Sequence, residues 1–92
     1  MAVVDISPKI YRMPSNGKGV RFWQFELDGQ GSWRSRYGYE GSDNIATTTW
    51  TFAEPRDQPD ARSQATTDAN AEMMAKLAST HHLTIQEATE AL

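Results

Sequence analysis

The sequence contains no cysteine, which excludes a disulfide framework and any metal site built on thiolates. It also has no long hydrophobic run. The N-terminal residues lack the apolar core of a signal peptide, and no segment approaches the length of a membrane span. We therefore expect a soluble, cytoplasmic protein. Its 92 residues suffice for one small domain with a modest core.

Catalytic signatures are missing as well. No nucleophile elbow, phosphate-binding loop or metal-ligand pattern occurs, so we expect no enzymatic activity, no cofactor and no small-molecule substrate. His81 and His82 are the strongest candidates for a metal site or a general base. Adjacent residues do not share a helix face, however, and no third ligand stands at ligand spacing. We interpret the pair as complementing the C-terminal end of a helix.

Charge is limited and unevenly placed, with a net value of −3. Residues 1–52 carry six Lys and Arg against five Asp and Glu, whereas residues 53–92 carry three against seven. A mildly acidic chain is a poor general binder of polyanions, so any contact with nucleic acid must be local and must come from the first half. The acidic second half can equally face a basic protein surface.

Aromatic and arginine side chains are concentrated in residues 20–41, which contain two Trp, two Phe, two Tyr and three Arg. Alternating patterns, separated by turns rich in Gly, Asn and Asp, predict four strands. These strands are expected over residues 9–13, 20–27, 32–39 and 45–53. Strands joined by such short turns form an antiparallel meander.

The remainder of the chain predicts helices. Residues 54–67, with two prolines, are expected to be a linker. Thr67 is the expected N-cap of a helix over residues 68–80. Thr84 and Glu87 fit a capping box that begins a short helix ending at Leu92. The predicted fold class is α+β: a small four-stranded antiparallel meander followed by one or two C-terminal helices packed on one face.

The run FWQFELDG, followed by SWRSRYGYEG, by TTTWTF and then by a helix, resembles the WGR domain. That family is a small α+β module of poly(ADP-ribose) polymerases and of many short bacterial and phage proteins. In its naming motif Gly38 and Gly41 match, while Tyr37 stands where the family has Trp and Tyr39 where it has Arg. The resemblance covers most of the chain and makes residues 1–92 a single WGR-like domain. It implies a non-catalytic module that recognises nucleic-acid ends or strands.

We predict binding to nucleic acid (DNA or RNA) or to a nucleoprotein complex through an arginine- and aromatic-rich strand surface. Arg34 and Arg36 share one face of their strand and Arg21 lies on the neighbouring strand, so the three are expected to form one exposed cluster. The predicted binding residues are Lys18, Arg21, Arg34, Arg36 and Tyr39.

A competing interpretation exists for several of these side chains. The arginines can instead pair with acidic residues across strands and simply solvate an outer face. Those acidic residues are Glu26, Asp28 and Glu40. Trp33 and Tyr37 either stack on unpaired bases or pack in the core beneath the helix. We favour the core, because the apolar helix stripe needs a face to cover, and this leaves Tyr39 as the exposed aromatic.

The alternative function is a phage-encoded protein inhibitor of the anti-CRISPR type. Such a protein would block a host CRISPR nucleoprotein complex in the bacterial cytoplasm, through contacts to protein and to guide RNA. The basic strands would meet RNA or acidic protein, and the acidic second half would meet basic protein. Salt-dependent binding to naked oligonucleotides separates the two functions, because only a nucleic-acid module predicts it.

Overall fold

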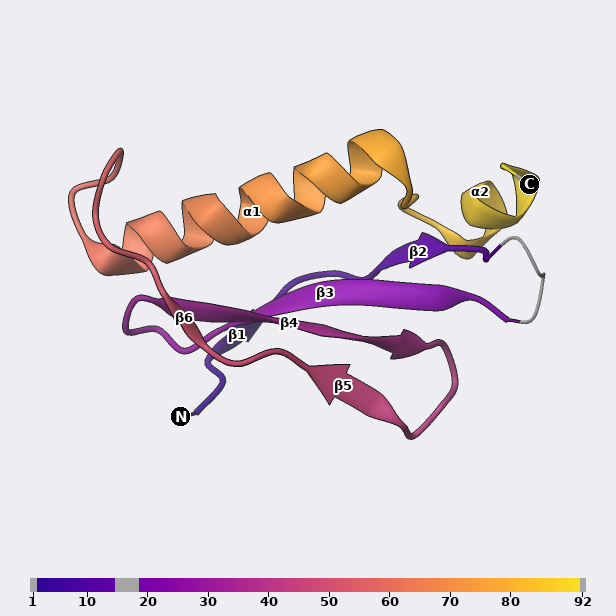
Figure 1. Cartoon of the computed structure of the whole chain (residues 1–92), viewed down its shortest axis with the longest axis horizontal. Helices are drawn as coiled ribbons and strands as arrows, with labels where there is room; N and C mark the ends of the chain where they lie inside the picture. Colours follow the sequence, from indigo (N-terminus) through magenta and orange to yellow (C-terminus); the bar gives the residue numbers. More distant parts are fainter. Residues whose placement is uncertain (1, 15–18, 92) are drawn as a thin grey trace.

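Two long antiparallel strands, β3 (Arg21–Leu27) and β4 (Ser32–Tyr39), form the centre of the sheet (Figure 1). The computed structural model describes residues 2–14 and 19–91. Both central strands lie where the alternating patterns predict them. Their pairing places Leu27 opposite Trp33 and Arg21 opposite Tyr39.

Each outer row of the sheet consists of two short strands. β1 (Asp5–Ile6) and β2 (Ile10–Arg12) both pair with β3, while β5 (Ile45–Thr47) and β6 (Thr51–Phe52) both pair with β4. Every pairing is antiparallel. Pro8 interrupts the first row, because proline has no N–H to give to a sheet ladder. The predicted α+β class and the meander are confirmed, with both edges broken.

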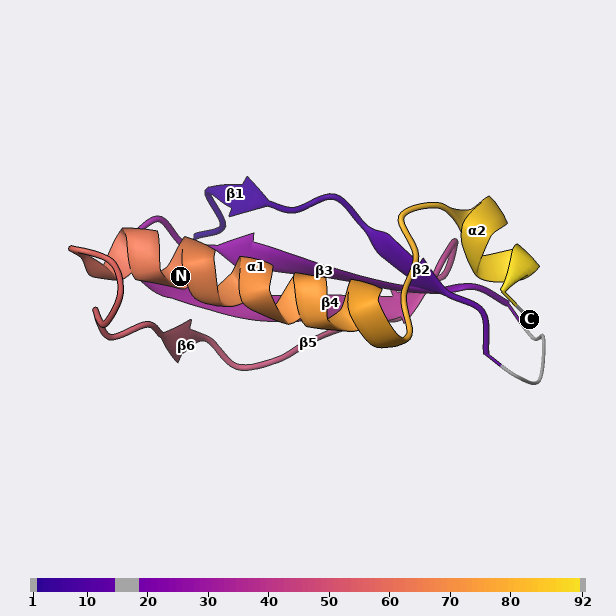
Figure 2. The same cartoon turned by 90° about the horizontal axis from the view of Figure 1, so that it is seen from above.

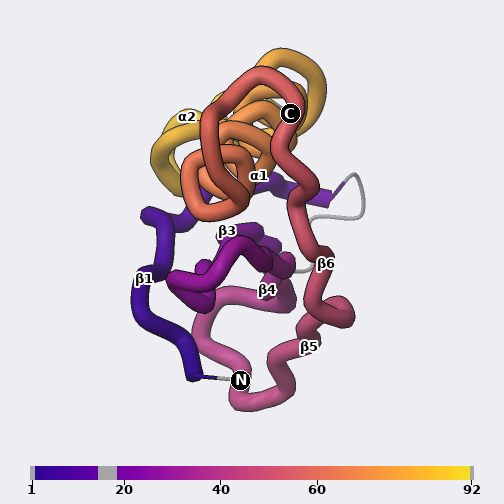
Figure 3. Tube along the Cα trace, turned by 90° about the vertical axis from the view of Figure 1, so that its left-hand side faces the viewer, coloured from indigo at the N-terminus to yellow at the C-terminus, as the bar shows by residue number. Residues whose placement is uncertain are grey.

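Helix α1 (Ala61–Ser79) runs along one face of β3 and β4 (Figures 1 and 2). Viewed along the strands, it lies above the central pair, with β1 and β6 on either side (Figure 3). The predicted start at residue 68 is wrong. The side chain of Asp60, not of Thr67, caps the helix by accepting a hydrogen bond from the Ser63 N–H at 2.8 Å. Both linker prolines precede Asp60, so nothing prevents residues 61–67 from being helical.

The short second helix, α2 (Ile85–Glu90), begins as predicted. Thr84 is its N-cap, and its hydroxyl accepts from the Glu87 N–H at 3.1 Å. The helix ends at Glu90, and the predicted end at Leu92 lies outside the described residues. α2 packs on β2 and buries Ala88.

The core lies between α1 and the sheet. Its buried members are Ile10, Trp23, Phe25 and Ala69, and the partly buried residues packed around them are Leu27, Trp33, Tyr37, Met73 and Leu77. The Trp23 and Phe25 rings meet edge to face, with centroids 6.3 Å apart. The favoured interpretation of Trp33 and Tyr37 as core residues is therefore confirmed.

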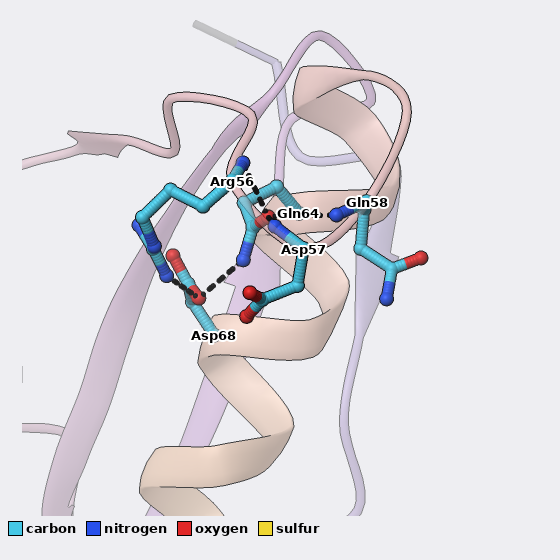
Figure 4. Close-up of polar contacts among 5 residues, drawn as sticks. All are labelled: Arg56, Asp57, Gln58, Gln64 and Asp68. Carbon is cyan, nitrogen blue, oxygen red and sulfur yellow. Dashed lines mark hydrogen bonds and ion pairs between the residues drawn. The ribbon is translucent and has the colours of Figure 1, made fainter.

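A buried glutamine fixes the loop that leads into α1. The Gln64 Oε1 atom accepts hydrogen bonds from the backbone N–H groups of Arg56, Asp57 and Gln58 at 2.9, 2.9 and 3.2 Å (Figure 4). Its Nε2 atom donates to Asp68 Oδ1 at 2.9 Å, and the Arg56 guanidinium reaches the same oxygen at 2.6 Å. A side-chain amide offers an acceptor and a donor on separate atoms, so Gln64 anchors the loop over residues 54–60 to the first turns of α1.

The turn between β3 and β4 lies against the start of α1. The buried Asp28 carboxylate accepts from the N–H groups of Gln30 and Ser32 at 2.8 and 2.9 Å. Gly31 has a φ of 102°, and a Cβ atom added to it would lie 2.5 Å from the Ala61 Cβ. Glycine is therefore required at position 31 for both its backbone conformation and its close approach to the helix.

Replacing Gly31 by Ala tests this contact, and Gly41→Ala is the matched control. Gly41 also has a positive φ, of 85°, but has nothing within 4 Å of an added Cβ. Gly41→Ala should lower the free energy of unfolding by about 1–2 kcal/mol through backbone strain alone. Gly31→Ala should cost a further 1–3 kcal/mol, roughly, because Ala61 must move. Equal losses in urea titrations of the two variants would show that the turn does not press on α1.

Candidate nucleic-acid interface

The register of β3 and β4 separates the predicted arginine cluster into two parts. Residues directly opposite each other in an antiparallel pair project from the same face. Arg21 is paired with Tyr39 and therefore lies on the face that α1 covers, whereas Arg34 and Arg36 project from the opposite face, which we call the open face. The prediction of a single arginine cluster is wrong. The register pairs Arg21 with Tyr39, whereas Arg34 and Arg36 are paired with Glu26 and Gln24, whose side chains project from the other face of β3. Lys18, the fifth predicted binding residue, lies outside the described residues.

On the open face, Arg34 is neutralised by a neighbour. Its Nε atom lies 2.7 Å from the Glu26 Oε1, and the Glu26 side chain is only 8 % exposed. The guanidinium also lies over the Trp50 ring, 4.4 Å from the centroid. The competing interpretation, in which the arginines pair with acidic residues across strands, is confirmed for Arg34 and Glu26. This arginine contributes little free positive charge to a binding surface.

The other open-face cations cover the sheet. Arg36 donates to the Gln24 Oε1 and lies 5.8 Å from the centroid of the Phe22 ring. Lys9 lies 4.4 Å from the same ring and pairs with Glu40 at 3.1 Å. Phe22 is only 2 % exposed although α1 covers the opposite face of the sheet. The long cationic side chains therefore shield the apolar ring by lying across it.

Breaking the Arg34–Glu26 pair should destabilise the fold. Arg34→Gln leaves a buried carboxylate without its counter-charge, which should lower the free energy of unfolding by about 1–3 kcal/mol. The double variant Glu26→Gln/Arg34→Gln removes both charges and should recover part of that loss, because two amides can hydrogen bond to each other. Urea titration measures both. A single variant as stable as the parent, or a double variant less stable than the single, would show that the pair is not stabilising.

The helix-covered face carries a second, different set of cations. Arg12 on β2 and Arg21 on β3 are directly opposite each other in the register and project toward α1. Lys76, in the last turn of α1, and His81, just beyond it, lie beside the same hollow. We call this hollow, of about 320 Å³, the cationic groove. Its lining residues are Arg12, Arg21, Phe22, Trp23, Ser35, Tyr37, Thr48, Glu72, Lys76 and His81.

Positive charge in the cationic groove is poorly compensated. Across residues 2–14 and 19–91, no ion pair reaches Arg12 or Arg21, and the sole carboxylate among the described lining residues is Glu72, 3.9 Å from Lys76. Like charges directly opposite each other on paired strands are destabilising. A local conflict of this kind is typical of a functional surface, where an anionic partner relieves it.

His81 reports the electrostatics of the cationic groove. Its pKa is lowered from 6.5 to about 4, first by burial and then by the nearby charges of Lys76, Arg12, His82 and Arg21. The imidazole is therefore neutral at pH 7, hydrogen-bonded through Nδ1 to the Thr80 hydroxyl at 2.7 Å. A neutral ring supplies no charge to the helix C-terminus, where the backbone N–H of His81 donates to the Lys76 carbonyl at 2.8 Å. The dipole role of the histidine pair stays a prediction.

His82 has a different, structural task. Its backbone N–H and carbonyl exchange hydrogen bonds of 2.6 and 2.7 Å with the carbonyl and N–H of Tyr11. This isolated antiparallel bridge ties the segment after α1 to the edge strand β2. In the part of the chain that the structure describes, no three His, Asp or Glu side chains gather in a way that could hold a metal ion.

The lowered pKa of His81 predicts how stability varies with pH. Below pH 6.5 the unfolded chain protonates this residue, while the folded protein resists protonation down to about pH 4. The stability linked to His81 is therefore complete above pH 6.5 and is lost as the pH falls toward 4. His81→Gln should show a shallower loss of unfolding free energy across this window than the parent or the control His82→Gln. Urea titrations at several pH values measure the slopes, and identical slopes would contradict the prediction.

Tyr39 completes the surface beside the cationic groove. Its ring lies 5.2 Å from the Arg21 guanidinium carbon, and the residue is 43 % exposed, as expected for the outermost aromatic of β4. Of the five predicted binding residues, the structure thus brings Arg21 and Tyr39 together and places Arg34 and Arg36 elsewhere.

Four charged or titratable groove residues were not among the predicted binding residues: Arg12, Glu72, Lys76 and His81. Arg12 alternates with Ile10, and a core-facing Ile10 would have placed Arg12 on the helix-covered face. Lys76 is adjacent to Leu77 in the apolar stripe of the helix. The sequence therefore contains a signal for the orientation of Arg12 and of Lys76. It does not show that the end of β2 and the last turn of α1 lie next to each other in the fold.

Comparison with protein-family models, with curated proteins and with solved structures finds no match to this chain. The resemblance to the WGR domain therefore stays a prediction.

Neither α1 nor α2, the helices of the described part of the chain, has the length and apolar character that a membrane span requires.

Proposed function

We propose that this protein is a non-enzymatic binding module that docks on nucleic acid or on a nucleoprotein complex through the cationic groove and Tyr39. One observation carries the proposal: Arg12 and Arg21 face each other across paired strands without an acidic partner among the described residues. Phosphate oxygens are the natural counter-charge for such guanidinium groups, which present several donors in a fixed geometry.

The composition of the surface favours nucleic acid over other polyanions. Tyr39 beside Arg21 offers an exposed aromatic face, and base stacking on such rings is a common way to hold strands without sequence preference. Arg12, Arg21 and Lys76 can neutralise only a few phosphates. The net charge of −3 weakens contacts elsewhere on the chain. We therefore expect modest affinity with a shallow but measurable salt dependence.

A different observation favours the alternative of a protein inhibitor that docks on a nucleoprotein machine. Ile6 and Phe52 are 46 % and 57 % exposed. Ile6 is the register partner of Glu26 and Phe52 that of Ser32, so both occupy open-face positions of the sheet. Exposed apolar side chains beside paired charges are typical of a protein–protein interface. In this alternative the open face meets protein, while the cationic groove meets guide RNA or acidic protein.

Fluorescence anisotropy with labelled oligonucleotides tests the proposal. Raising the salt from about 50 to about 200 mM should weaken binding several-fold, because each phosphate contact releases a counterion. The variant Arg12→Gln/Arg21→Gln should bind about tenfold more weakly or worse. The charge-matched control Arg36→Gln/Arg62→Gln removes two positive charges outside the groove and should bind like the parent.

The possible results separate the two functions. If the control variant alone loses binding, the nucleic-acid surface includes Arg36 or Arg62 and the groove assignment is wrong. If the parent shows no salt-dependent binding to any oligonucleotide, the nucleic-acid function is wrong and the inhibitor alternative is favoured.

A further inference from the structure

The cationic groove is bordered by the sheet, by α1 and by the segment after α1. Its floor is the helix-covered face of β3 and β4, with Trp23 and Tyr37 among its lining residues. One wall is the C-terminal half of α1, and His81, in the segment after α1, is also a lining residue. That segment runs beside β2 (Figure 1), to which the bridge between Tyr11 and His82 ties it. The volume of about 320 Å³ lies at the small end of the range for small-ligand sites, roughly 300–1,000 Å³.

The two ends of the cationic groove differ in chemistry. Arg21 is the first residue of β3, and Arg12 is its partner in the register of β2 and β3. Their guanidinium groups therefore lie at one end of the groove, near His81. Glu72 lies one helical turn before Lys76, toward the other end of the groove. Cations at one end and a carboxylate at the other suit a ligand that carries an anion at one end and hydrogen-bond donors at the other.

We propose that the cationic groove holds a single unpaired nucleotide whose base carries an amino group. The phosphate lies between Arg12 and Arg21, the base lies between the floor of the groove and α1, and Glu72 accepts a hydrogen bond from the amino group. This inference rests on the proposed function and adds the form of nucleic acid recognised. A base inside a duplex cannot enter a hollow of this size, whereas an unstacked base can.

The Glu72 carboxylate predicts that the groove prefers cytosine over thymine. Cytosine presents an amino donor at the position where thymine presents a carbonyl oxygen, and a glutamate accepts from that amino group. Cytosine and thymine are similar in size, so a difference between them reports this contact more than stacking. Neutral His81 leaves the anion to Arg12 and Arg21. Lys76, 3.9 Å from Glu72, adds positive charge along the helix wall of the groove.

Oligo(dC), oligo(dT) and a duplex of equal length serve as probes in anisotropy titrations, and free cytidine monophosphate serves as a probe in calorimetry. Oligo(dC) should bind about tenfold tighter than the duplex and about fivefold tighter than oligo(dT). Glu72→Gln should abolish the preference for dC over dT, and Lys76→Gln should weaken binding of all single strands. Lys9→Gln, on the open face, is the control and should change neither. Circular dichroism of each variant verifies folding.

Each contrary outcome has a distinct meaning. If duplex and single strands bind equally, or if Glu72→Gln leaves the base preference unchanged, the nucleotide pocket is wrong while the nucleic-acid module stands. If cytidine monophosphate binds and no oligonucleotide does, the module is wrong and the pocket takes a free nucleotide instead. If neither binds, both proposals are wrong.

Discussion

The pairing register of β3 and β4 is the constraint on which the rest of this structure depends. The Asp28 carboxylate holds the connecting turn by accepting two backbone N–H groups, and the turn places Leu27 opposite Trp33. Because side chains alternate along a strand, a shift of one residue would exchange the two faces of the sheet. The observed register directs Trp23 and Phe25 into the core under α1, and it sends Arg34 and Arg36 to the opposite side.

The cations of this protein differ in their surroundings, and the surroundings decide what each does. Arg34 lies against a nearly buried carboxylate and an aromatic ring, so its charge is used within the fold. Arg12 and Arg21 face each other instead. Burial first, and then the positive charges around it, lower the pKa of His81, so its imidazole stays neutral. Positive potential collects where charges lack partners. This is why the cationic groove, and not the richer arginine pattern of β4, is the stronger candidate interface.

The sequence predicts the central strands, the fold class and the Thr84 cap well, because alternation and capping are local signals. It fails where a property depends on how two elements meet. Period-two alternation assigns Arg34 and Arg36 to one face, but it cannot assign Arg21 to the same or the opposite face without the register. The early start of α1 depends on Asp60 and on the buried amide of Gln64, whose loop partners are adjacent only in the folded chain. The same holds for Arg12 on β2 and Lys76 on α1. The sequence of neither element shows that the two residues lie at one site.

Structural anchors and the candidate interface lie at opposite ends of α1. The Gln64 hydrogen bonds, the Asp60 cap and the contact of Gly31 with Ala61 all fix its first turns. The cationic groove lies under its last turns, where Lys76 and Glu72 meet the strand ends and the chain leaves toward the Tyr11–His82 bridge. A helix held firmly at one end can tolerate an unfavourable cluster of like charges at the other. The fold thus separates the contacts that determine its geometry from those that leave charge available to a partner.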